Sequence, residues 1–410
     1  MFYDMVELNN IPIVVLSMSR WDGDYSSTSW SLAKTFAETR TVIYVDYPYT
    51  WTEYARKRHS SGIQKRKKAL FGRGNGLVQL TQYSSNLYAL TPPLMFPVNW
   101  LPRGKAFDLF SSMTDKVLWK SIKAALEELG QSELILFNAF NPLYLSVPPK
   151  DPAIKAVVYQ SQDNIRALET YLRKHGNDAE VIAVQNAQLS IATSKQLQKD
   201  LTELSGKQVE YLPNAADFDL FTTAFTDRLE KPHDLQDISH PIIGYTGNIC
   251  HRVDYDLIQA ICLAHPDKNL VMVGPRNHHG HTDIDLDAIP NLHFLGSKKL
   301  EQLPSYLAHF DVLILPFLIN EVTKSIYPLK INEYLASGKP VVATPFSEDI
   351  QTFGKWISLE TEHQRFAQTI QKELEEDSLE KTVDRNEVAS RNTWENRVGT
   401  FWKLLYAALK

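Results

Sequence analysis

The stretch DVLILPFLINEVTKSIYPLKINEYLASGKPVVAT, residues 311–344, decides the fold class of this chain. Two short apolar runs, at 311–317 and 339–344, flank a segment with the apolar spacing of a helix. Pro328 suits the first turn of that helix, and Gly338 suits the left-handed residue that follows a helix. The stretch therefore predicts a strand, a helix and a second, parallel strand, which is the repeating unit of an α/β protein.

The same alternation continues through the rest of the chain. Its apolar runs suit strands that helices cover on both faces, as a parallel sheet requires. The pattern predicts an α/β fold with two Rossmann-like, doubly wound domains facing across a cleft, and ligands at the carboxyl ends of the strands. We expect further strands at 11–18, 41–48, 133–140, 154–161, 189–194, 208–213, 241–248, 269–275 and 291–296, and further helices at 28–39, 106–129, 254–264 and 299–308.

A change of pattern near residue 220 predicts the division into domains. The stretch EKPHDLQDISHP is polar, contains two prolines and has no apolar run, which is typical of a linker. The last residues have apolar side chains spaced three and four apart, which predicts an amphipathic helix that packs on a domain. We expect a first domain at 1–220, a linker at 221–240, a second domain at 241–390 and a terminal helix at 391–410.

Composition excludes several classes of protein. The chain has 410 residues, 43% of them hydrophobic, and a formal net charge of −5, which argues against disorder, coiled coils and a generally basic nucleic-acid binder. Two cysteines are too few for a disulfide scaffold, so we expect a reducing compartment. The N-terminus lacks a basic signal-peptide region, and no apolar run reaches the length of a membrane span. These features predict a cytoplasmic protein.

Lys330 and Glu333 are the leading candidates for ligand binding. They lie three residues apart on one face of the predicted helix, close to its N-terminus at Pro328 and Leu329, where unpaired N–H groups favour an anion. A lysine there can neutralise a diphosphate, and a carboxylate one turn deeper can accept two hydrogen bonds from a ribose diol. An ordinary exposed Lys–Glu pair is the alternative.

The residues from 316 to 344 resemble the donor-binding element of GT-B glycosyltransferases, in particular the bacterial family 4 group that builds polysaccharides from nucleotide sugars. The motif PLK followed by EYLASGKPVVAT carries the resemblance. Further segments agree in order, among them IIGYTGNICHRVDYDLI, NLVMVGP and YLPNAADFDLF. The resemblance implies a GT-B fold with the acceptor in the first domain and a nucleotide-sugar donor in the second, and a terminal helix that crosses back onto the first domain.

Several donor-side roles follow from this resemblance. It implies that Glu333 holds the donor ribose and that Lys330 contacts the diphosphate. Glu333 corresponds to the second glutamate of a pair in the family, and this chain has Ser325 where the family usually has the first, so we expect altered contacts to the donor sugar. Gly247, Asn248 and Arg252 follow the strand at 241–248; glycine allows a phosphate to approach the backbone, and arginine can bind it, although a simple strand-to-helix turn is the alternative.

The acceptor-side candidates lie in the first domain. Asp22 and Gly23 are in the loop after the first predicted strand, at a place where the family has a glycine-containing loop near the acceptor. Asp163 follows another predicted strand and resembles an aspartate of the family's acceptor region. A helix N-cap is the alternative role for Asp163.

A basic stretch stands out against the acidic net charge. Residues 54–107 contain ten Lys or Arg and no Asp or Glu, and they include the apolar residues Met95, Phe96, Trp100 and Leu101. Such residues suit contact with an anionic membrane or a lipid-phosphate acceptor. A solvated loop is the alternative, and nucleic acid is not expected. The predicted membrane contacts are Arg56, Lys57, Arg58, Lys65, Arg66, Lys67 and Lys68.

These observations together predict a glycosyltransferase of cell-surface polysaccharide synthesis. It would move a sugar from a nucleotide-diphosphate donor, expected to be a UDP-sugar, to a glycan or lipid-linked acceptor, and the resemblance implies retention of configuration. Lys330 and Arg252 would stabilise the leaving group, with Asp163 a lesser candidate for the base. No metal or other cofactor is expected, and histidines 278, 279 and 281 are assigned to a solvated loop. The alternatives are a catalytically degenerate nucleotide-sugar-binding or assembly protein, and a GT-B-fold epimerase.

Overall fold

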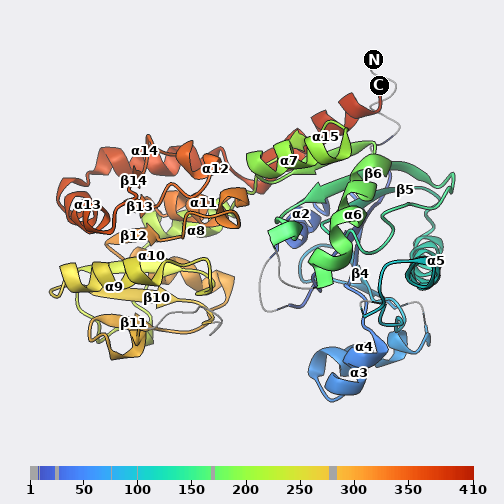
Figure 1. The fold of residues 1–410 in the computed structure, drawn as a ribbon, viewed down its shortest axis with the longest axis horizontal. Helices are drawn as coiled ribbons and strands as arrows, with labels where there is room; N and C mark the ends of the chain where they lie inside the picture. Colours follow the sequence, from blue (N-terminus) through green and yellow to red (C-terminus); the bar gives the residue numbers. More distant parts are fainter. Residues whose placement is uncertain are drawn as a thin grey trace. The chain divides into compact units, whose positions relative to one another are not determined.

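Two compact units make up the computed structural model of the chain (Figure 1). The structure describes residues 8, 10–23, 27–74, 76–98, 100–167, 171–276 and 284–410. The first unit consists of Met1–Leu212 together with Val398–Lys410, and the second unit is Pro213–Arg397. Each unit has its own parallel sheet, so the predicted α/β class with two Rossmann-like units is confirmed.

The first unit is built on a sheet with the strand order β3-β4-β2-β1-β5-β6-β7-β8. Only β3 runs antiparallel to its neighbour among these described strands. β2, β3 and β4 lie on one side of β1, and the chain crosses to the other side between β4 and β5, so the topological switch point lies between β1 and β5. Its strands are β1 (Ile13–Ser17), β2 (Val42–Val45), β3 (Leu77–Gln79), β4 (Leu87–Leu90), β5 (Leu134–Ala139), β6 (Ile154–Ser161), β7 (Leu189–Ala192) and β8 (Glu210–Tyr211).

Helices cover this sheet because its central strands are apolar on both faces. Every residue of β1, β2 and β5 is buried. The last helix, α15, begins in the second unit and ends in the first, where Phe401 packs against Phe36 at a ring distance of 5.0 Å. The helices of the first unit are α2 (Thr28–Phe36), α3 (Trp51–Lys57), α4 (Ser61–Leu70), α5 (Lys105–Glu128), α6 (Tyr171–Asn186) and α7 (Lys195–Ser205), with α15 spanning Trp394–Ala408.

The second unit is built on an all-parallel sheet with the order β11-β10-β9-β12-β13-β14. Its strands are β9 (Ile242–Thr246), β10 (Asn269–Val273), β11 (Leu292–Phe294), β12 (Val312–Leu315), β13 (Val341–Ala343) and β14 (Ser358–Leu359). Its helices are α8 (Phe218–Thr226), α9 (Tyr255–Ala264), α10 (Leu303–Ala308), α11 (Leu329–Ala336), α12 (Glu348–Gln351), α13 (His363–Glu376) and α14 (Leu379–Ser390).

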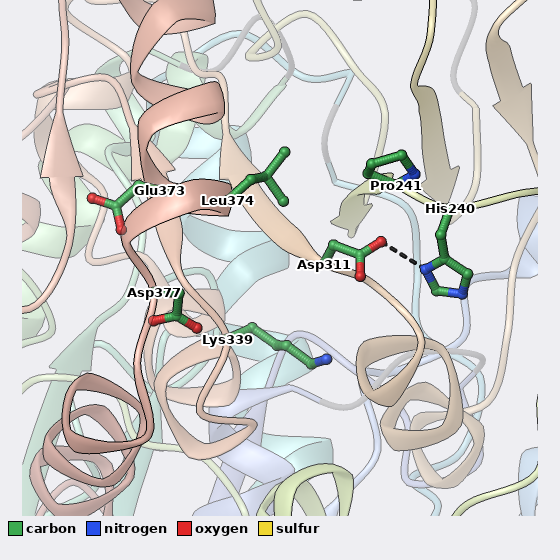
Figure 2. A pocket seen from close by; sticks show the side chains of 7 residues that line it. All are labelled: His240, Pro241, Asp311, Lys339, Glu373, Leu374 and Asp377. Atoms are coloured by element: carbon green, nitrogen blue, oxygen red, sulfur yellow. Dashed lines mark hydrogen bonds and ion pairs between the residues drawn. The ribbon is translucent and has the colours of Figure 1, made fainter.

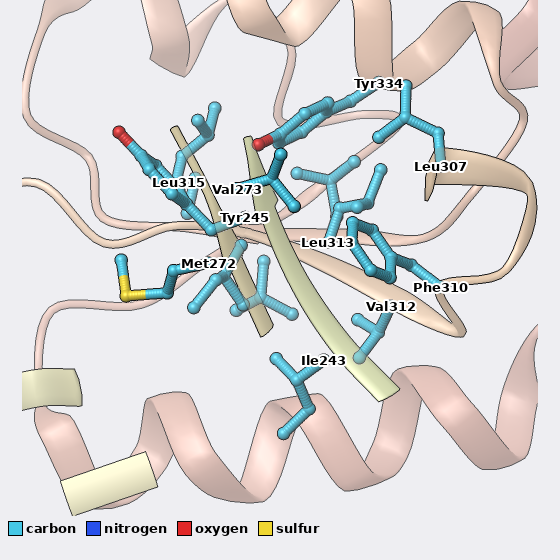
Figure 3. Packing of buried hydrophobic residues seen from close by; sticks show 14 of the residues in the cluster. Ile243, Tyr245, Met272, Val273, Leu307, Phe310, Val312, Leu313, Leu315 and Tyr334 are labelled. Carbon is cyan, nitrogen blue, oxygen red and sulfur yellow. The ribbon is translucent and has the colours of Figure 1, made fainter. Parts of the chain in front are cut away.

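The core of the second unit explains Gly244, which lies in the middle of β9. Figure 3 shows the side chains around this strand, among them Phe310 and Tyr334. A Cβ atom on Gly244 would lie 2.1 Å from the Phe310 ring, so the ring occupies the space that a side chain would need. Gly244 is therefore a packing residue, and it does not bring the backbone close to a phosphate.

The boundaries between units differ from the predicted ones. The structure divides the chain after Leu212 and after Arg397, whereas we expected a linker at 221–240 and a terminal helix from 391. The predicted linker contains the end of α8 and a 3₁₀ turn, His233–Leu235, and both belong to the second unit. Phe221, Ala224 and Leu235 are buried in the core of that unit, which is the physical reason for the difference.

Candidate functional site

The candidate donor residues lie at the carboxyl ends of β9 and β12. The segments that follow these two neighbouring strands are joined by a bridge between Val253 and Phe317. In addition, Leu318 N–H donates to the carbonyl of Arg252 at 2.9 Å. Both segments are therefore held at the edge of the sheet where open α/β proteins bind their ligands.

Gly247 is the residue at which β9 ends, and its backbone requires glycine. Its φ of 144° is unfavourable for other residues. A Cβ atom at Gly247 would lie 3.5 Å from Cε of Lys330, so the lysine side chain passes directly over this turn. On the other side, Gly274 approaches so closely that a Cβ there would overlap the Gly247 carbonyl oxygen. The structure thus brings together Gly247 and Lys330, which are 83 residues apart in the sequence.

Lys330 and Glu333 form an ion pair on α11. Lys330 Nζ donates to Glu333 Oε2 at 2.8 Å. The Glu333 side chain is only 2% exposed, whereas that of Lys330 is 25% exposed. The alternative of an exposed surface pair is therefore wrong for Glu333. A buried carboxylate with one oxygen on lysine keeps a second oxygen as an acceptor.

Two tyrosines that the sequence analysis missed fix this turn. Tyr334 OH accepts a hydrogen bond from Thr246 N–H at 2.8 Å and lies 3.2 Å from the Thr246 carbonyl oxygen, to which it donates. Tyr245 OH donates to the carbonyl of Asn248 at 3.1 Å. The Tyr334 bonds join helix α11 to the end of β9, and the Tyr245 bond closes the turn that follows β9. Tyr334 directly follows Glu333 in the motif Glu-Tyr-Leu-Ala, which is the signal that could have identified this residue.

The remaining donor-side candidates lie around this turn with different exposure. Arg252 is partly buried, and its Nε donates to Cys250 Sγ at 3.4 Å. Pro328 is the N-cap of α11, one position before its first helical residue, Leu329. Ser325 is 1% exposed in the 3₁₀ turn Thr323–Ser325. Gly247, Lys330 and Glu333 thus lie together at this turn, and Ser325 is buried.

In the first unit, Asp22 is held by Arg66 of helix α4. Both Asp22 carboxylate oxygens accept hydrogen bonds from the guanidinium group, at 2.6 and 3.0 Å. The same guanidinium donates through Nε to Asp46 Oδ2 at 2.7 Å, and Asp46 is fully buried. Burial by itself would lower the pKa of Arg66, but the two carboxylates raise it. Arg66 therefore stays charged and ties the loop after β1 to the end of β2.

A second arginine ties the same loop to helix α3. Arg20 makes two hydrogen bonds to the Glu53 carboxylate, at 3.1 and 3.0 Å, and its guanidinium lies 3.4 Å from the ring centre of Tyr49. Gly23 N–H donates to the carbonyl of Arg20 at 3.0 Å. The predicted acceptor loop around Asp22 and Gly23 is thus bound to both α3 and α4. Two-point carboxylate–guanidinium pairs hold planar groups in a defined orientation.

Asp163 lies in the loop after β6, exposed to solvent. The adjacent 3₁₀ turn, Ile165–Ala167, is capped by Asn164, whose side chain accepts from Arg166 N–H at 3.1 Å. The alternative role of Asp163 as a helix N-cap stays a prediction. Beneath this loop, Glu180 of α6 is buried and accepts hydrogen bonds from Tyr159 OH and Ser161 Oγ, at 3.1 and 2.7 Å.

The buried Glu180 makes stability depend on pH. Burial raises its pKa from 4.5 to about 7, although the two hydroxyl groups and Arg166 oppose this shift. Because the folded protein favours the neutral carboxyl, we expect stability that is fully present below pH 4.5 to be lost as pH rises through 7. This pH-dependent part of the free energy of unfolding amounts to up to about 3 kcal/mol, and replacing Glu180 with glutamine should remove it. Urea unfolding of both proteins at pH 5 and pH 8 measures the free energy of unfolding. An equal change in that free energy between the two pH values for both proteins would contradict the prediction.

The basic residues from Arg56 to Lys68 lie in and between helices α3 and α4, neither of which the sequence analysis predicts. Arg66 is 6% exposed, so its assignment as a membrane contact is wrong: its charge is used inside the unit. Met95 is 2% exposed in the core, so the expectation that it contacts a membrane is also wrong. The other predicted membrane contacts are exposed to solvent: Arg56, Lys57, Arg58, Lys65, Lys67 and Lys68.

A cavity of about 470 Å³ lies at the opposite, amino end of the second unit's strands (Figure 2). His240 Nδ1 lies 2.7 Å from Asp311 Oδ2 in its wall, and Lys339 also faces it. None of the predicted site residues lines this cavity. We assign the functional edge to the carboxyl ends, because parallel sheets bind ligands there. Within the described part of the chain, no group of three or more His, Cys, Asp or Glu residues is arranged to hold a metal ion. Residues 278, 279 and 281 lie outside the described part.

Comparison with known proteins connects this edge to a family. Residues 240–376 match the family described as Glycosyl transferases group 1. TuaH of Bacillus subtilis, whose name describes it as a teichuronic acid biosynthesis glycosyltransferase, is 28% identical over 181 residues. That match spans 43% of this chain and 45% of TuaH, so it covers less than half of the relative's length.

Solved structures match nearly the whole chain. Sucrose-phosphate synthase from Thermosynechococcus elongatus has a TM-score of 0.64 and 17% identity, over 97% of this chain and 100% of that one. HepE of Anabaena, in a complex with UDP and glucose, has a TM-score of 0.62 and 17% identity, over 96% and 100%. At these identities the likeness shows the fold, and the predicted GT-B fold is confirmed.

Proposed function

We propose that this protein, which has the GT-B fold of glycosyltransferases and matches the group 1 family over residues 240–376, transfers a sugar from a nucleoside-diphosphate donor to a glycan or lipid-linked acceptor in polysaccharide synthesis. The donor we propose is a UDP-sugar. HepE, which has the same fold and was solved with UDP and glucose, supports this choice of donor. The name of TuaH, a teichuronic acid biosynthesis glycosyltransferase, supports a role in polysaccharide synthesis. Retention of configuration is part of the proposal and comes from the family resemblance.

The arrangement of Gly247, Lys330 and Glu333 carries the proposal. An ammonium group above a glycine turn at the edge of a parallel sheet suits a diphosphate, because the turn lets phosphate oxygens approach the backbone. The free oxygen of the buried Glu333 carboxylate suits a ribose hydroxyl. The N-terminus of α11 at Leu329 adds favourable partial charge for an anion.

These groups would act on the bond that breaks. The bond between the anomeric carbon and the β-phosphate oxygen breaks, and the leaving diphosphate takes the electron pair. Lys330, with Arg252 from the neighbouring segment, stabilises that negative charge. The acceptor oxygen bonds to the anomeric carbon and passes its proton to the leaving phosphate. Asp163 is the lesser candidate for the base.

The acceptor side of the proposal includes contact with a membrane. The exposed basic residues of α3 and α4 suit the anionic surface at the inner face of the cell membrane. A lipid-linked acceptor would lie in that same membrane. The helices of the described residues include none that is long and apolar enough to cross a bilayer.

Turnover is the experiment that tests the proposed function. Incubation with UDP-glucose and related UDP-sugars should release UDP, slowly by hydrolysis and faster with an acceptor glycan. Release of UDP is measured by chromatography, with Lys330→Ala as the comparison protein, whose rate should fall at least about tenfold. Nucleotide binding with no sugar transfer or hydrolysis during long incubation would favour the degenerate binding protein and overturn the transferase.

A further inference from the structure

Helix α5 exposes an apolar stripe that the sequence analysis did not identify. Leu109, Met113 and Val117 recur every four residues and are 60%, 46% and 40% exposed. The opposite face is buried in the unit through Thr114, Leu118, Ile122, Ala125 and Leu126. The helix is thus apolar on two faces, and only one of them packs on its own domain. A single exposed leucine is unremarkable, but a continuous stripe marks an interaction surface.

Two further aromatic residues shortly before α5 in the chain are also exposed. Phe96, which is 57% exposed, lies 6.5 Å from Phe110 of α5 between ring centres. Trp100 is 72% exposed in the segment that leads into α5. We call Phe96, Trp100, Leu109, Phe110, Met113 and Val117 the apolar face.

The apolar face is connected to the basic helices α3 and α4. The segment before Phe96 pairs with both: Met95 N–H donates to the carbonyl of Tyr49 at 2.8 Å, Trp51 N–H donates to that of Met95 at 3.1 Å, and Leu94 N–H donates to that of Leu70 at 3.0 Å. Trp51, the first residue of α3, and Phe71, the C-cap of α4, are each 43% exposed and pack edge to face at 5.9 Å. The surface therefore combines exposed aromatic residues with lysines over several elements.

The charges on this surface indicate what kind of partner it fits. Lys116 and Lys120 are exposed on α5, at helical spacing from Met113 and Val117. Lys65, Lys67 and Lys68 are exposed on α4, and no Asp or Glu occurs from residue 54 to 107. Lysine is depleted in protein–protein interfaces, whereas aromatic and aliphatic residues flanked by lysines are typical of helices that lie in an anionic bilayer surface.

We propose that the apolar face inserts into the interfacial layer of an anionic bilayer, while the lysines of α4 and α5 bind the lipid headgroups. This deepens the membrane contact in the proposed function by naming the inserting residues. Long-range attraction by the lysines depends on salt, and insertion of apolar side chains does not. The two contributions are therefore separable by experiment.

Sedimentation with lipid vesicles tests the proposal. Phosphatidylcholine vesicles with phosphatidylglycerol should bind the full chain, and vesicles of phosphatidylcholine only should bind it weakly. The triple variant Leu109→Ser/Met113→Ser/Val117→Ser should bind the anionic vesicles at least about tenfold more weakly, and this loss should persist in high salt. The reason is that each apolar side chain that leaves water for the bilayer contributes favourable free energy to binding. The matched control is Leu263→Ser/Leu379→Ser, two leucines of the second unit that are 73% and 72% exposed. It should bind like the unchanged protein.

Further measurements distinguish membrane insertion from dimer formation and from donor binding. Brominated lipids should quench tryptophan fluorescence in the unchanged protein and less so in Trp100→Phe. Equal binding by the triple variant and the unchanged protein would overturn the proposal, as would equal losses in the control. A dimer in solution that the triple variant dissociates would assign the face to a second copy instead. UDP-sugar binding by the same variants tests the proposed function independently, because the apolar face is outside the donor residues.

Discussion

Replacing Arg66 with methionine is expected to lower the free energy of unfolding by about 3–5 kcal/mol, because it leaves a buried carboxylate without its counter-charge. Asp46 is 0% exposed and accepts from Arg66 Nε at 2.7 Å. The Asp46 carboxylate also accepts hydrogen bonds from the Thr91 hydroxyl and the backbone N–H of Trp21, and both of these donors are neutral. They leave the full negative charge buried when the guanidinium is removed.

Urea unfolding followed by circular dichroism measures this effect. Lys67→Met is the matched control, since Lys67 is on the same helix but exposed, and surface substitutions usually change stability by less than about 0.5 kcal/mol. Adding Asp46→Asn to Arg66→Met should restore part of the loss, because the buried charge is then gone. A loss for Arg66→Met no larger than for Lys67→Met would show that the pair does not stabilise the unit.

The Arg66 pair also shows why part of the structure was not predictable. In α4 the buried residues are Ile63, Arg66 and Leu70, at the spacing of one helix face. An arginine at the middle position disguises that face, because its partners, Asp22 and Asp46, lie 44 and 20 residues earlier in the chain. The helix was therefore missed, and its basic residues were assigned to a membrane as one group.

The strands and the donor element were predictable for the opposite reason. β9, β10 and β12 are apolar runs whose burial on both faces follows from composition and spacing. The local pattern around Pro328 and Gly338 also predicts α11, and Gly338 has the expected left-handed backbone with φ of 72°. The hydrogen bonds of Tyr334 to Thr246, 88 residues away, depend on the packing of α11 on β9. The local sequence pattern therefore does not predict them.

Replacing Glu333 with glutamine is expected to weaken UDP binding by about 1–3 kcal/mol, which is the usual loss when a hydrogen bond to a charged group is removed. Glutamine retains one acceptor oxygen and the volume of the side chain, so α11 should stay folded. Calorimetric titration of the protein with UDP, GDP, dTDP and ADP identifies the base and measures the change. The matched control is Glu373→Gln, a carboxylate of the same unit that lines the cavity at the amino ends of the strands.

Dideoxy-UDP, which lacks both ribose hydroxyls, separates a ribose contact from an effect through Lys330. If Glu333 accepts from the diol, dideoxy-UDP should bind the unchanged protein more weakly than UDP does, and Glu333→Gln should not weaken it further. The two losses are then one interaction, removed from either side. If Glu333 only orients Lys330, to which it is bound at 2.8 Å, the substitution should weaken UDP and dideoxy-UDP equally. Failure of all four nucleotides to bind would contradict the donor site itself, and with it the transferase.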